Sequence, residues 1–197
     1  MTIKKRTRIL TEHNSDGTHT ETSLTALLDH QLIWDETISG SAVTSVTTNG
    51  TVTLDGNAHG GYWFEIIIEN TSGSATQYYL YFNNDQTSTN YYQHGQHSNS
   101  SGADAYNNNT AELIPNGRTV TIGGYAMTTG MIMITPAGRT SYNNNGHYND
   151  TGAGGVLHNV QVVRKTATVT NLTRIDVVAS VASAIGVDSQ FRLWRRI

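Results

Sequence analysis

The chain has 197 residues, a length that suits one domain, and its apolar fraction of 37% is low but sufficient for a packed core, because the apolar residues gather in short runs. Only 14% of the residues are charged and the net charge is −3, which excludes the broad basic surface of a non-specific nucleic-acid binder. Since cysteine is absent, neither disulfides nor thiolate metal sites can stabilise the fold, and packing or oligomerisation must do so.

Residues 1–40 are expected to form an extended N-terminal arm. Four positive charges gather near its start, at Lys4, Lys5, Arg6 and Arg8. The rest of the chain is net acidic, so we expect the arm to lie along an acidic neighbouring protein; a solvated, poorly ordered tail is the alternative. The segment "SLTALLDHQLI" (residues 23–33) predicts one or two turns of helix within this arm. No apolar segment predicts a secretory signal or a membrane span.

From residue 41 onward the main pattern is the period-two alternation of half-buried strands. In "YWFEIIIE" one face would carry Tyr62, Phe64, Ile66 and Ile68, and the other face would carry Trp63, Glu65, Ile67 and Glu69. Comparable segments lie at residues 41–48, 50–54, 76–82, 118–124, 131–135, 156–165, 172–180 and 191–197. Many short strands without interleaved helices predict an all-β fold, an antiparallel two-sheet sandwich over residues 41–197, with the eight-stranded jelly roll as the best fit.

The second faces of two strands are unusually apolar. Trp63 and Ile67 share one such face, and Tyr79 and Tyr81 share another. Apolar and aromatic clusters outside a core mark contact surfaces, so we expect a homotrimer. The alternative is that loops or the arm cover these side chains.

Two long polar segments, residues 83–114 and 136–155, are predicted to be loops. They hold tyrosines among Asn, Ser and Gly, namely Tyr91, Tyr92, Tyr106, Tyr142 and Tyr148. This mixture of rigid rings and adaptable hydrogen-bonding groups is typical of binding loops and predicts a recognition surface. Solvated spacers are the alternative interpretation.

Catalytic and metal-binding patterns are weak. The sequence lacks a nucleophile elbow, a phosphate-binding glycine loop and the common metalloprotease and calcium motifs, so no enzyme activity and no cofactor are expected. His94 and His97 lie close together in "YYQHGQHSN", but two loop histidines make a poor metal site, and whether they bind an ion is left open.

Two stretches carry a resemblance to a known class of protein. "YYLYFNNDQTSTNYYQHG" (Tyr78–Gly95) and "GVDSQFRLWRRI" (Gly186–Ile197) resemble segments of virion structural proteins of tailed bacteriophages. The resemblance implies a β-sandwich that assembles, often as a trimer, on the virion. Because little chain precedes the sandwich, we expect a capsid cement or decoration protein that binds the major capsid protein. The alternative is a tail fibre or receptor-binding module in which the tyrosine loops recognise a host surface glycan.

Overall fold

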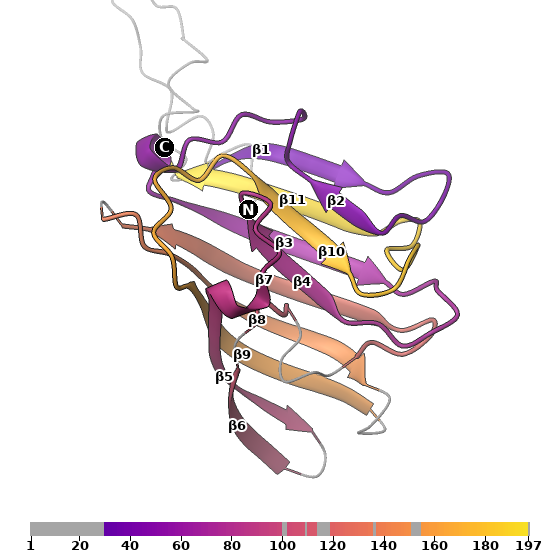
Figure 1. Ribbon diagram of the computed structural model, residues 1–197. Coiled ribbons are helices and arrows are strands. Elements are labelled where there is room, and N and C mark those ends of the chain that lie inside the picture. Colours follow the sequence, from indigo (N-terminus) through magenta and orange to yellow (C-terminus); the bar gives the residue numbers. More distant parts are fainter. Residues whose placement is uncertain are drawn as a thin grey trace, which may run out of the picture.

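The computed structural model describes residues 30–99, 102–108, 110–113, 119–135, 137–150 and 155–196. These residues form a nearly all-β fold of two antiparallel sheets packed as a sandwich, as predicted (Figure 1). The basic residues Lys4, Lys5, Arg6 and Arg8 lie outside the described residues, as does most of the predicted helix.

Eight strands of the described chain form the large sheet. Their spatial order is β1 (His30–Thr37), β11 (Gln190–Arg196), β3 (Gly61–Glu69), β7 (Tyr125–Ile134), β8 (Thr140–Asp150), β9 (Gly155–Lys165), β5 (Tyr91–Asn99) and β6 (Gly102–Asn108). Consecutive strands are neighbours along β7–β8–β9 and in the β5–β6 hairpin. The other neighbours in the sheet come from distant parts of the sequence.

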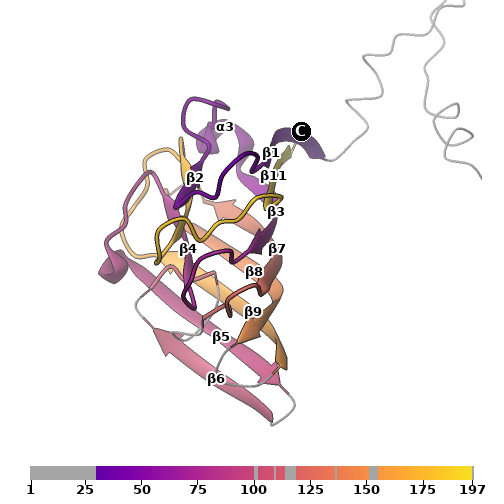
Figure 2. The same ribbon diagram turned by 90° about the vertical axis from the view of Figure 1, so that its right-hand side faces the viewer.

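The small sheet has three strands in the order β2 (Ser45–Thr47), β10 (Ile175–Ala179) and β4 (Tyr78–Phe82). It forms the second layer of the sandwich (Figure 2). In Figure 1 it lies over the β1–β11–β3–β7 part of the large sheet, while β5 and β6 extend beyond it. Two short helical turns complete the described elements, α3 (Gly56–His59) and the 3-10 turn η1 (Ser88–Asn90).

The core lies between the layers, where alternate residues of each strand point inward. In β3 the inward residues are those expected from the alternation, Tyr62, Phe64, Ile66 and Ile68. They pack in one apolar cluster with Tyr78, Leu80 and Phe82 of β4. Burying these large side chains is the main driving force for joining the two sheets.

Several boundaries differ from the sequence expectation. Residues 30–37, which were expected to belong to the arm, form an edge strand paired with β11, so the described sandwich includes residues before 41. Residues 50–54 and 119–124, which were expected to form strands, belong to no named strand. An eight-stranded sheet against a three-stranded one does not confirm the predicted jelly roll, which has two similar sheets.

The largest difference concerns the two predicted loops. Residues 91–99, 102–108 and 140–150 are strands β5, β6 and β8 of the large sheet. Their inward positions hold polar residues such as Gln93 and Asn144, both buried, so an apolar-polar alternation is not visible in the sequence. The loop prediction was therefore wrong for most of both segments.

Candidate contact surface on the large sheet

The outward side of the large sheet, here called the outer face, is built by the register of its strands. Paired residues on neighbouring strands share a face, so each row of paired residues crosses the sheet. One row runs over all eight strands through Leu32, Trp194, Trp63, Met131, Asn143, Val162, His94 and Asn107. The register thus assembles residues from the whole length of the chain on one surface.

Large apolar side chains are exposed on this outer face. Val160 is 51% exposed and Trp63 is 44% exposed. The other large apolar residues exposed on the same face are Leu32, Tyr92, Tyr125, Met127, Met133 and Val162. Single exposed apolar side chains are ordinary, but a group that covers several neighbouring strands marks a surface for binding.

Three charged groups on the outer face form a small ion-pair network. The Arg192 guanidinium of β11 lies 2.7 Å from a carboxylate oxygen of Glu65 on β3 and 3.3 Å from one of Asp35 on β1. The hydrogen bond to Glu65 is the main reason that the pKa of Arg192 is raised. Arg192 thus offsets one of the two carboxylate charges, and the neighbouring residues of the surface are largely apolar.

Three shallow hollows lie side by side over β3, β7 and β8. Their volumes are about 220, 290 and 220 Å³. Trp63 lines two of them, once with Met131 and Met133 and once with Asn143 and Val160. The outer face can therefore accept protruding side chains or flat ligands rather than enclose a small molecule.

The structure places Trp63 and Ile67 together on the outer face, Trp63 exposed and Ile67 half-buried. Tyr92 is exposed there too, opposite Arg164 of β9. Sequence reasoning missed the contributions of β7 and β9. A signal was present in "VLHNVQVVRK", where valines occur in both phases of the alternation, so that Val160 and Val162 must face away from the inward-facing Val163.

Four of the five tyrosines expected on recognition loops are instead buried. They are Tyr91, Tyr106, Tyr142 and Tyr148. Each occupies an inward position of a strand, because alternate residues of β5, β6 and β8 point into the sandwich. Burial raises the pKa of Tyr142 well above its ordinary value, so its hydroxyl remains a hydrogen-bond donor.

These inward polar groups bind one short piece of main chain, residues 110–113, here called the bridging segment. The Tyr142 hydroxyl donates to the carbonyls of Ala111 and Glu112, at 3.0 Å each. Gln161 Nε2 donates to the Glu112 carbonyl at 2.8 Å and to the Leu113 carbonyl at 3.1 Å. The carbonyls of the bridging segment accept hydrogen bonds from these side chains. The polar side chains of β8 and β9 can therefore be buried inside the sandwich.

Two more amides complete this arrangement. Gln93 Nε2 donates to the Glu112 carbonyl at 3.2 Å, and Asn144 Nδ2 donates to the Leu113 carbonyl at 3.1 Å. We call Gln93, Asn144 and Gln161 the amide cluster. The Tyr106 hydroxyl also donates to Gln161 Oε1, at 2.8 Å. The cluster is structural, because its hydrogen bonds are made within the interior of the protein.

Tyr79 and Tyr81 lie on the outward side of the small sheet. Their rings stack with centroids 5.7 Å apart, and Tyr81 also makes an edge contact with Tyr91. Burial raises the pKa of Tyr81 to about 12. Tyr81 is thus covered by this chain's own residues, while Tyr79 remains half-buried.

His94 and His97 point to opposite sides of β5. His94 is exposed on the outer face, and His97 is 2% exposed and packs against Tyr106, with ring centroids 5.8 Å apart. Residues three apart in a strand face opposite ways, so these two imidazoles cannot share an ion. No group of three or more His, Asp or Glu side chains arranged for a metal occurs in the described part of the chain.

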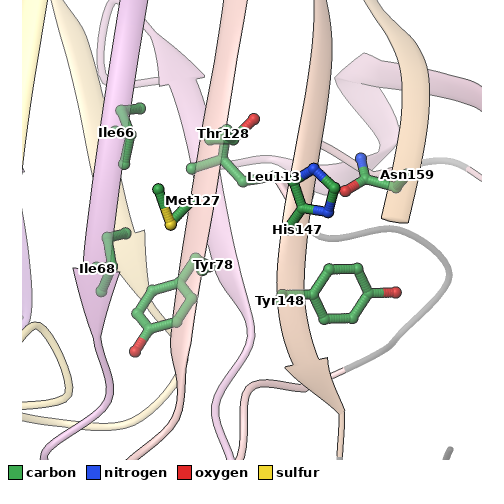
Figure 3. A pocket seen from close by; sticks show the side chains of 10 residues that line it. Ile66, Ile68, Tyr78, Leu113, Met127, Thr128, His147, Tyr148 and Asn159 are labelled. Carbon is green, nitrogen blue, oxygen red and sulfur yellow. The ribbon is translucent and has the colours of Figure 1, made fainter. Parts of the chain in front are cut away.

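A further small cavity lies inside the sandwich (Figure 3). Its volume is about 10 Å³, and its lining includes Ile66, Ile68, Tyr78 and Tyr148. This is room for about one water molecule, so it is not a ligand site. The outer face is the better candidate for function.

The described residues contain no helix that is long and apolar enough to span a membrane. No protein-family model matches the sequence, and the search of curated proteins also found no match.

Proposed function

We propose that this protein is a structural component of a tailed-phage virion, most simply a cement or decoration protein that stabilises the capsid by binding the major capsid protein. The observation that carries the proposal is the outer face of the large sheet, with its exposed apolar residues over neighbouring strands. A surface of this kind is suited to contact with protein, since burying apolar area is the main source of affinity.

The chemistry of the exposed residues favours protein over other partners. Five of the exposed side chains, Leu32, Met127, Met133, Val160 and Val162, are aliphatic or thioether groups, which gain from burial against protein but offer no hydrogen bonds. A net charge of −3 gives no attraction to nucleic acid. The hollows are open and shallow, which suits interlocking with a second protein surface.

The virion context comes from the resemblance of Tyr78–Gly95 and Gly186–Ile197 to phage structural proteins. In the fold these segments supply β4, η1, the first part of β5, and β11. They belong to the scaffold of both sheets. The resemblance supports a β-sandwich scaffold in common with phage structural proteins. The outer face supplies the surface through which such a scaffold would bind other virion proteins.

We further propose that the protein acts as a homotrimer. Light scattering of the isolated protein at high micromolar concentration should give three times the monomer mass. A monomeric mass there, together with a monomeric state on isolated capsids, would contradict the trimer.

The test of the capsid role is binding to capsids that lack this protein. Replacing Trp63 and Val160 together with Ser should weaken binding at least about ten-fold, because central exposed anchors dominate such contacts. The matched control is Ile122→Ser, since Ile122 is 62% exposed but lies in a turn outside the named strands. Equal binding by both variants would contradict the proposal.

Position in the virion has its own test. A stained gel of purified virions should show hundreds of copies per particle, as a capsid protein requires. About a dozen copies would instead place the protein in the tail.

The alternative is a tail module that recognises a host surface glycan. The observation that favours it is the hollow in which Trp63 lies beside Asn143, Asn145 and Thr129. An aromatic ring next to amides and a hydroxyl can stack on a sugar and bind its hydroxyl groups. Binding to host cells that is lost in Trp63→Ser and competed by free surface glycan would support this alternative over the capsid role.

A further inference from the structure

We propose that His147 and His158 form a binding site for a divalent late-transition-metal ion, with Cu²⁺ bound most tightly. The two residues are directly paired across β8 and β9 and both belong to the outer face. They are eleven positions apart in the sequence, on two antiparallel strands. The sequence alone does not indicate that they are neighbours. The site does not depend on the proposed virion role.

The separation of the two rings fits a shared ion. Their centroids are 5.0 Å apart and the ring planes are inclined by 45°. Because a nitrogen–metal bond is about 2.0–2.1 Å, an ion lies roughly 3 Å from the centre of each ring, and two rings that share it at a near-tetrahedral angle have centroids roughly 5 Å apart. In Figure 3 the imidazole of His147 lies over β8. Little movement is needed for both side chains to reach one ion.

A neighbouring amide orients the ring of His158. His158 Nε2 lies 2.7 Å from Asn145 Oδ1, which can only accept, so Nε2 carries the hydrogen and donates it. The lone pair of the neutral ring is then on Nδ1. Histidine ligands in metal sites are commonly held in this way by a hydrogen bond at the other ring nitrogen.

The surroundings leave room for the rest of the coordination shell. A hollow of about 220 Å³ adjoins His147 and is also lined by Asn145 and Met127. Met127 is paired with His147 on the other side, from β7. Two imidazoles leave positions for water or for a ligand from another molecule, and the order of affinities of nitrogen ligands for divalent ions places Cu²⁺ above Ni²⁺ and Zn²⁺.

The site is open to solvent and has two protein ligands, so its affinity for the ion should be well below that of a closed four-ligand site. Other charged groups near the pair are few among the described side chains. Glu65 lines the same hollow, but its carboxylate is paired with Arg192.

Calorimetric titration of the tag-free full chain with Cu²⁺, and separately with Zn²⁺, tests the proposal. His147→Asn and His158→Asn should each lower the affinity of one Cu²⁺ equivalent at least about ten-fold, and Asn145→Ala should lower it about ten-fold through the lost orienting hydrogen bond. The matched control is His94→Asn. His94 is exposed on the same outer face but is paired with Val162 and Asn107 rather than with a second histidine, so this variant should bind like the parent.

A second readout identifies the ligands directly. In NMR spectra, substoichiometric Cu²⁺ should broaden the imidazole signals of His147 and His158 before that of His94. If the parent, the two histidine variants and His94→Asn all bind Cu²⁺ alike, or if the His94 signal broadens first, the proposed site is wrong.

Discussion

The two halves of the large sheet bury very different side chains. In β11, β3 and β7 most inward residues are apolar or aromatic, for example Phe191, Phe64 and Ile132. In β8, β9 and β5 the inward positions include the amide cluster, Gln93, Asn144 and Gln161, all buried. The first half packs against the small sheet, and the second half hydrogen-bonds to the bridging segment.

This difference shows two ways of closing one sandwich. Apolar burial is tolerant of detail, because any well-fitting side chain of similar volume will serve. A buried amide is not tolerant, because each donor and acceptor needs its partner and an unsatisfied group is costly. The polar half should therefore be the more sensitive to single substitutions.

The largest loss of unfolding free energy is expected for Gln161→Leu. This change removes the donor to the Glu112 and Leu113 carbonyls and the acceptor for Tyr106, all in the interior. The two carbonyls keep other donors, but the Tyr106 hydroxyl and the Gln93 amide lose the Gln161 oxygen that accepts from both, which should cost roughly 2–3 kcal/mol of unfolding free energy. Urea denaturation measures it.

The matched control in the apolar half is Ile132→Leu, at a fully buried position of β7. A volume-conserving apolar exchange should cost less than about 1.5 kcal/mol. If Gln161→Leu proves no more costly than this control, the contrast between the halves is wrong.

A smaller loss of unfolding free energy is expected when the ion pair between the end of β9 and the turn after β4 is removed. Lys165 Nζ contacts Asp85 Oδ2, with side chains 6% and 25% exposed. Burial opposes ionisation of Asp85, but hydrogen bonds from Lys165 and Asn90 outweigh it and lower the pKa of the carboxyl from 3.8 to about 2. The charged form is thus favoured in the folded protein.

The pH dependence follows from that direction. A lowered folded pKa stabilises the protein above the unfolded pKa of 3.8, and the contribution is lost as the pH falls from there toward 2. Asp85→Asn should cost about 1–2 kcal/mol at pH 6 and close to nothing near pH 2. Thermal unfolding at both pH values measures this. Asp35→Asn is the control, since its pair with Arg192 is exposed and should contribute less than about 1 kcal/mol at pH 6; equal losses for both would contradict the assignment.

The smallest effect is expected on the outer face. Val160→Ser should change the unfolding free energy of the isolated monomer by no more than about 0.5 kcal/mol, because Val160 is exposed and outside the core. The chemical denaturation midpoint at low protein concentration measures it. A loss above 1 kcal/mol would mean that Val160 is already buried, either in the monomer or in an oligomer that persists on dilution.

The sequence predicted which residues of the apolar half face inward, but it did not predict the strands of the polar half. The alternation in "YWFEIIIE" correctly assigned Tyr62 to Glu69 of β3 to their faces, because hydrophobic burial leaves a period of two. In "TSYNNNGHYND" the inward Asn144 and the outward Asn143 are the same residue type, so no alternation distinguishes them. The partners that make Asn144 suitable for burial lie about thirty residues earlier, in the bridging segment.

The same reason limits the prediction of the outer face. Trp63 and Ile67 were recognised because they belong to one strand with a clear pattern. His147 and His158 belong to different strands, and only their register places them opposite each other. Register depends on the turns and on burial across the sheet, and a single sequence does not reveal it. His94 and His97, three residues apart in the sequence, lie on opposite faces of β5.

The bridging segment also bears on how the protein opens. Its main chain bonds to β4 of the small sheet, through the Leu80 amide to the Ala111 carbonyl and the Leu113 amide to the Tyr78 carbonyl, while its carbonyls accept side chains of the large sheet. If one sheet separates from the bridging segment, the polar groups that bonded to that sheet lose their partners, while the segment stays bonded to the other sheet. In deuterated water the amide protons of Leu80 and Leu113 should therefore exchange together, with a free energy of opening equal to that of global unfolding. The sandwich would then unfold as a single cooperative unit, although its two layers differ so much in size.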